Sequence, residues 1–114
     1  FTLQPLVENY FVHGVDHKRK DNVISIKVRR VGEAVEIRVQ DNGRGMEPNQ
    51  LQRIQQILSH RDPREEVEES KERQSIGIVN VHERFLLYFG DRYHIQITSE
   101  KGKGVLYTIT IEDT

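Results

Sequence analysis

The chain contains no cysteine and no tryptophan, only one methionine and three prolines, and aromatic residues make up 7% of it. The absence of cysteine excludes disulfide bonds and thiolate metal sites. Lysine and arginine together number 17 and aspartate and glutamate 18, so the net charge is −1 and no global positive field attracts nucleic acid. No apolar run approaches the roughly 20 residues that a membrane span needs. We therefore expect no partner nucleic acid and no direct membrane contact in this segment.

The length of 114 residues suits one domain with one hydrophobic core. The sequence begins at Phe1, inside a helical pattern and without a methionine or an N-cap residue. We therefore expect residues 1–114 to form a single domain of a longer protein. A membrane anchor or a sensor would then belong to another part of that protein.

Hydrophobic spacing predicts an α+β fold. Residues that alternate between apolar and polar indicate antiparallel strands with one polar face, and apolar residues at helical spacing indicate helices laid over the other face. The pattern is typical of a two-layer α/β sandwich with a mixed, mainly antiparallel sheet, three covering helices and a ligand between the layers. We expect the first strand to bury Ile24, Ile26 and Val28. The expected helices cover about residues 3–17, 48–58 and 77–89, and the expected strands residues 23–30, 34–40, 93–97 and 105–111.

A polar segment separates the second and third expected helices. Residues 59–74 contain a run of charges from Arg64 to Arg73 and almost no apolar side chains. Such a segment cannot bury itself, so it is either a solvated loop or a mobile lid. Its charge alone favours nothing more specific than a solvated linker.

The run Asp41-Asn42-Gly43-Arg44-Gly45-Met46 is the most informative motif. Asp41 follows Val39 on the buried side of a strand. Burial of a carboxylate there without a hydrogen-bond donor costs several kcal/mol of desolvation free energy, because even a neutral polar group costs roughly 2–7 kcal/mol. The exocyclic amino group of a base is one such donor. Gly43 and Gly45 permit positive φ and leave no Cβ in the way of a ligand. Taken alone, the motif favours ordinary turn chemistry over a ligand site.

Two further motifs flank this one. Asn9 and His13 lie at i, i+4 spacing on one face of the first expected helix, where an amide oxygen and an imidazole can serve a metal, a phosphate or each other. The alternative is a polar helix edge that ends at Gly14. Downstream, Gly77 and Ile78 begin an amphipathic helix, and the free amides of a helix N-terminus bind phosphate.

Four segments in a fixed order resemble the GHKL ATPases, the class that includes gyrase, heat-shock chaperone, histidine kinase and MutL proteins. LQPLVEN with the following HG resembles the N box of sensor histidine kinases of the LytS/YesM type, and DNGRGM resembles the G1 box. SIGIVNVHERFLLYFG resembles the G2 box with its helix, and GKGVLYTITI the closing strand. The resemblance covers nearly the whole chain and implies the ATP-binding catalytic domain of a two-component sensor histidine kinase.

The resemblance also implies roles for individual residues. Asn9 would hold Mg²⁺ on the triphosphate of ATP, and Asp41 would bind the adenine amino group. The other residues of the implied nucleotide site are His13, Gly43, Gly45, Met46, Gly77 and Ile78. Residues 59–75 would form the ATP lid. The implied partners are a histidine-bearing dimerisation domain of the parent kinase and a downstream response regulator, and the domain would be cytoplasmic in a membrane-anchored parent.

A further feature concerns the reaction. GHKL members that hydrolyse ATP carry a glutamate one helical turn before the metal-binding asparagine, and Pro5 occupies that position here. Glu8 is the remaining candidate catalytic residue, although it lies about 100° around the helix from Asn9. We therefore expect the domain to hold ATP and present its γ-phosphate, because positioning and charge neutralisation carry most of the catalysis in phosphoryl transfer.

The chain departs from the family pattern at three positions. Val12 stands where a basic residue usually precedes the His-Gly pair, Ser75 replaces the first glycine of the G2 box, and Val105 replaces a threonine that often contacts the base-binding aspartate. Two alternatives therefore stay open. One is a protein-serine kinase of the anti-sigma type with the same fold. The other is a degenerate nucleotide-binding or interaction domain without transfer activity.

Overall fold

A computed structural model of the chain describes residues 21–59 and 76–112. The elements in chain order are the strands β1 (Ile24–Val31) and β2 (Ala34–Asp41), the helices α2 (Pro48–Ser59) and α3 (Ile76–Phe89), a short 3₁₀ turn η3 (Gly90–Arg92), and the strands β3 (Tyr93–Ser99) and β4 (Val105–Glu112). The first expected helix, at about residues 3–17, lies outside the described residues, as does nearly all of the expected lid. No helix of the described part is long and apolar enough to cross a membrane.

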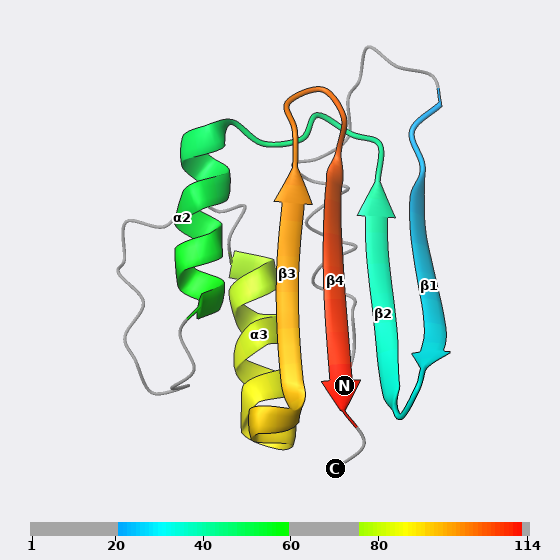
Figure 1. Ribbon diagram of the computed structural model, residues 1–114. Coiled ribbons are helices and arrows are strands. Elements are labelled where there is room, and N and C mark those ends of the chain that lie inside the picture. Colours follow the sequence, from blue (N-terminus) through cyan, green and yellow to red (C-terminus); the bar gives the residue numbers. More distant parts are fainter. Residues whose placement is uncertain (1–20, 60–75, 113–114) are drawn as a thin grey trace.

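The strands form one four-stranded sheet in the order β1-β2-β4-β3, and its three pairings are all antiparallel (Figure 1). The hairpin of β1 and β2 turns at Gly32, which has φ 61°. Val39 pairs with Ile26 on one side and with Tyr107 on the other. Directly paired residues point to the same face, so this row lies on the face that carries the core. The α+β fold expected from the sequence is confirmed.

Helices α2 and α3 pack toward the β3 side of the sheet (Figure 1). Pro48 is the first residue of α2, where its missing N–H removes no intrahelical bond. Ile54 and Leu58 of α2 are buried, as helical spacing predicts. The core joins both helices to the inner face of the sheet. Its buried members are Val39, Met46, Ile54, Leu58, Ile78, Val81, Phe85, Leu86, Tyr93, Ile97, Val105, Tyr107 and Ile109.

The expectation that β1 buries its apolar face is wrong for two residues. Ile26 is 46% exposed and Val28 is 65% exposed, although both share the inner face with Val39 and Ile37. The physical reason is position, because β1 is an edge strand and the two described helices pack near the opposite edge. The sequence pattern correctly predicts the face to which these side chains point, but it does not predict whether another element buries them.

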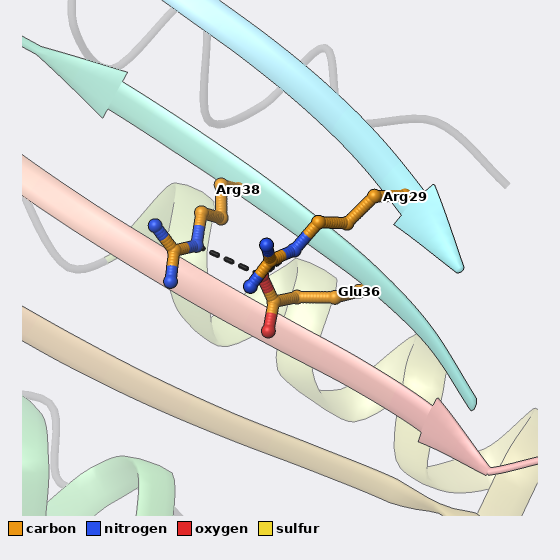
Figure 2. A network of polar contacts seen from close by, with 3 residues as sticks. All are labelled: Arg29, Glu36 and Arg38. Atoms are coloured by element: carbon orange, nitrogen blue, oxygen red, sulfur yellow. Dashed lines mark hydrogen bonds and ion pairs between the residues drawn. The ribbon is translucent and has the colours of Figure 1, made fainter. Parts of the chain in front are cut away.

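The outer face of the sheet is polar. Glu36 on β2 accepts hydrogen bonds at Oε1 from Arg29 Nε and from Arg38 Nε, each at 2.9 Å (Figure 2). The hydrogen bond from Arg29, together with the positive charges of both arginines, lowers the pKa of Glu36 below its ordinary value. This network lies on the face of β2 opposite to Val39 and Asp41.

Candidate functional site

Asp41 is the last residue of β2 and lies half-buried at the end of the inner face. Its Oδ1 accepts two backbone hydrogen bonds, one from Gly43 N at 2.8 Å and one from Val105 N at 3.3 Å. The second bond comes from β4, so two elements far apart in the sequence fix the carboxylate. Among the described residues, no group hydrogen-bonds to Oδ2. The inward orientation predicted from strand alternation is therefore confirmed, and one carboxylate oxygen remains for a ligand.

Electrostatics at Asp41 favour a ligand that donates a hydrogen bond. Burial raises the pKa of Asp41 above its ordinary value, and the hydrogen bonds from Gly43 and Val105 oppose this increase only in part. The ionised form is therefore less well solvated in the folded protein than in water. A donor placed at Oδ2 would replace the missing solvation, and an acceptor placed there would add repulsion.

Asn42 has a structural role that the sequence analysis did not assign. Its backbone N–H donates to Val23 O at 3.2 Å, and its Oδ1 accepts from Val23 N at 2.7 Å. Its Nδ2 donates to Asp21 O at 2.6 Å. These bonds tie the turn after β2 to the start of β1 and so keep the neighbouring Asp41 in place. The signal for this role is the preference of asparagine for turns in which its side chain bonds to backbone groups.

A second turn packs against the turn after β2 and braces it. Ser99 Oγ accepts a hydrogen bond from Met46 N at 2.9 Å and donates one to Gly104 O at 2.6 Å. Gly102 N donates to Arg44 O at 2.6 Å. These hydrogen bonds join the segment between β3 and β4 to the segment between β2 and α2, beside Asp41. Met46 is buried in the core, and its amide is used within the protein.

Two glycines allow these turns to approach each other. Gly45 has φ 70°, and a Cβ there would overlap with the backbone of Glu100. Gly104 has φ 88°, and a Cβ there would overlap with the carbonyl group of Asp41. Among the described residues Gly43 is not one of the glycines with positive φ. Gly45 therefore uses the positive φ that glycine permits, and Gly43 does not. Gly104 is a site residue that the sequence analysis missed, and the Gly-Lys-Gly turn before β4 is the signal that could have indicated it.

Helix α3 supplies the other described part of the predicted site. Gly77 is its second residue, in the turn where backbone amides lack partners within the helix. Ile78 is fully buried in the core, so only its backbone can contribute to a ligand site. Further along, the buried His82 lies with Nδ1 2.9 Å from the hydroxyl of Tyr93. This buried pair ties α3 to β3 away from the predicted site.

The remaining predicted site residues, Glu8, Asn9 and His13, lie outside the described residues, and so does Val12. No cluster of histidine, cysteine or acidic residues that could hold a metal occurs in residues 21–59 and 76–112. The described site therefore contains the carboxylate of Asp41, the two hydrogen-bonded turns that follow β2 and β3, and the N-terminus of α3. Asp41 supplies a hydrogen-bond acceptor whose orientation two backbone N–H groups fix.

Comparisons with known proteins agree with this geometry. The chain is 35% identical over 94 residues to the sensor histidine kinase YpdA of Escherichia coli. The aligned residues cover 82% of the chain and 14% of that protein. The chain is 34% identical over 110 residues both to the sensor protein LytS of Streptococcus mutans and to the sensor histidine kinase YesM of Bacillus subtilis, covering 96% of the chain in each case and 17% and 16% of those proteins. The chain thus spans less than a fifth of the length of these three relatives.

A solved structure gives the same fold. The blue-light activated histidine kinase of Erythrobacter litoralis EL346 superposes with a TM-score of 0.60 at 16% identity, over 96% of this chain and 28% of that chain. The family model described as histidine kinase-, DNA gyrase B-, and HSP90-like ATPase matches residues 1–114. The chain therefore belongs to the histidine kinase-, DNA gyrase B- and HSP90-like ATPase family.

Proposed function

We propose that this domain binds ATP, with the adenine amino group on Asp41, and presents the γ-phosphate to a histidine on a separate dimerisation domain. The observation that carries the proposal is the carboxylate of Asp41, whose Oδ1 accepts bonds from Gly43 and Val105. Two backbone donors fix its orientation before any ligand arrives. Such preorganisation favours one hydrogen-bonding pattern over others at little entropic cost.

The chemistry of Asp41 selects adenine over guanine. An ionised carboxylate only accepts hydrogen bonds. Adenine carries an amino group at the ring carbon where guanine carries a carbonyl oxygen. Asp41 would bind the first and repel the second, so the site would discriminate by an unfavourable contact as well as by a favourable one.

Binding of the triphosphate rests on the family and on residues outside the described part. Asn9 would hold Mg²⁺, which neutralises the phosphate charge when it is bound, and His13 would lie on the same helix face. The first turn of α3, with Gly77, would offer backbone amides to the phosphates. Residues 59–75 would form the lid over them.

We infer transfer rather than hydrolysis from the position of Pro5. The family's hydrolytic members carry a glutamate there that can activate water, and proline carries no such group. Glu8, which lies next to Asn9 in the sequence, would then be the candidate residue to polarise the accepting histidine. The chain's contribution would be to hold ATP in place while the acceptor approaches, which is the larger part of catalysis in this reaction class.

The partners follow from the sensor kinases that the chain resembles. We propose that the parent protein carries the histidine-bearing dimerisation domain, passes phosphate to a response regulator, and places this domain in the cytoplasm of a membrane-anchored kinase. A degenerate, non-transferring domain is the competing proposal. The observation that favours it is Val105, which brings a backbone N–H but no side-chain hydroxyl to Asp41.

Incubation with γ-labelled ATP and Mg²⁺ separates the two proposals. The chain is tested alone and mixed with the dimerisation domain of a relative such as YesM. The kinase proposal expects acid-labile label on the added domain, none on the chain alone, and loss of label with Asp41→Asn. A chain that binds ATP and never labels a histidine in any such mixture would favour the degenerate domain.

A further inference from the structure

Tyr107 lies next to Asp41 on the inner face of the sheet. It pairs with Val39, which is two residues before Asp41 on β2, and it is two residues after Val105 on β4. Residues in this diagonal relation are roughly 7–8 Å apart at Cα, within reach of an aromatic side chain. Tyr107 is therefore diagonal to Asp41 on the inner face, and the charge of the carboxylate that the proposed function assigns to the adenine base acts on it.

The hydroxyl of Tyr107 has no assigned task within the protein. The residue is 5% exposed, and no hydrogen bond to its hydroxyl occurs among residues 21–59 and 76–112. Tyr93, the other large buried tyrosine of the core, bonds to His82 instead. The hydroxyl is not one of the fully buried atoms that lack a partner, so Tyr107 differs from Tyr93 in having a hydroxyl that a bound molecule can reach.

Tyr107 can act only as a neutral group and a donor near Asp41. Burial raises the pKa of Tyr107 far above its ordinary value, and the nearby negative charge of Asp41 raises it further. The hydroxyl therefore keeps its proton at any physiological pH. A phenol in this state donates one hydrogen bond and can accept another.

Adenine presents two adjacent groups on the edge that Asp41 would face. The amino group donates, and the ring nitrogen beside the amino-bearing carbon accepts. Asp41 can serve only the first, and the backbone N–H of Val105 is already used by Asp41 Oδ1. An acceptor nitrogen left without a donor in a closed pocket would cost affinity.

We propose that Tyr107 is a specificity-determining residue of the nucleotide site, whose hydroxyl donates to the ring nitrogen beside the adenine amino group, directly or through one water. The inference rests on the proposed function, because it needs the base to lie on Asp41. It also explains how a site with Val105 in place of a hydroxyl-bearing residue can satisfy the base. The hydroxyl comes from the next inward-facing residue of the same strand.

The test compares ATP with the analogue in which that ring nitrogen is replaced by CH, by calorimetry on the full chain with Mg²⁺. In the unsubstituted chain we expect the analogue to bind about 5- to 10-fold more weakly, in the upper part of the range for one neutral hydrogen bond. In Tyr107→Phe the difference between the two nucleotides should fall to about 2-fold or less. Tyr93→Phe is the matched control, because it removes a buried hydroxyl that bonds to His82, and it should keep the full difference.

Each result has a defined meaning. Equal affinity of the unsubstituted chain for both nucleotides overturns the role of Tyr107, and this needs no variant that has to fold. A difference that persists unchanged in Tyr107→Phe overturns it as well and assigns the ring to the core alone. If the unsubstituted chain binds neither nucleotide, the proposed function itself fails, and that outcome is distinct from the other two.

Discussion

Replacement of Asp41 by asparagine removes one charge from the proposed base site and keeps its shape. The asparagine carbonyl can still accept the bonds from Gly43 and Val105, so the turn should hold. A hydrogen bond to a charged group contributes about 1.5–3 kcal/mol, so ATP should bind about 10- to 150-fold more weakly. Titration calorimetry with a non-hydrolysable ATP analogue measures this directly.

The same replacement should stabilise the folded protein at neutral pH when no nucleotide is added. The folded-state pKa of Asp41 is raised above its ordinary value of 3.8 because of burial, so the folded state binds more protons than the unfolded state above that pH. Stability from this group is therefore greatest below pH 3.8 and is lost as pH rises through the folded-state pKa. Asp41→Asn should melt at a higher temperature than the unsubstituted chain at pH 7, and the difference should shrink toward pH 4.

Glu36→Gln provides the matched control on the same strand. The pKa of Glu36 is lowered from 4.5, first by its hydrogen bond from Arg29, so its contribution is present above pH 4.5 and is lost as pH falls. This variant should melt slightly lower at pH 7 and keep its ATP affinity. The reasoning on Asp41 is refuted if Asp41→Asn is folded, binds the analogue normally and melts no higher than the unsubstituted chain.

Three further results are expected. Gly104→Ala should lose stability and ATP affinity together, because the Cβ would displace Asp41. Gly102 also has a positive φ, 81°, but a Cβ there meets nothing within 4 Å, so Gly102→Ala should lose only roughly 1–2 kcal/mol of stability. Equal ATP affinities of the two variants by calorimetry would contradict this expectation. Val105→Thr should bind ATP about 2- to 10-fold more tightly, as expected for one added neutral hydrogen bond; a lower melting temperature without tighter binding would show that the added hydroxyl finds no partner in the site. The chain alone should neither release phosphate from labelled ATP appreciably nor retain acid-labile label, and rapid release would contradict the role assigned to Pro5.

The sequence predicts those parts of the fold that depend on local pattern. Alternation and helical spacing give the hairpin of β1 and β2, both described α-helices and the last two strands, with bounds close to those observed. Alternation also gives the inward direction of Asp41. It fails for Ile26 and Val28, because the direction of a side chain does not determine whether another element covers it.

The parts of the site that depend on tertiary contacts were not predicted. The bond between Ser99 and Met46, and the approach of Gly104 to Asp41, require two turns separated by more than 50 residues to meet. The role of Tyr107 depends on the pairing of β2 with β4. The alternation of residues within one strand does not show which other strand it pairs with. The roles of Asn9 and His13 stay predictions.

The central claim is that Asp41 and its neighbours form an adenine site. Titration of the ¹⁵N-labelled chain with ATP and Mg²⁺, and separately with GTP and Mg²⁺, tests it most directly through the amide signals of Gly43 and Val105, which both bond to the Asp41 carboxylate. We predict saturable shifts of both signals with ATP and none of comparable size with GTP. Unchanged signals with ATP, or equal responses to both nucleotides, would contradict the account.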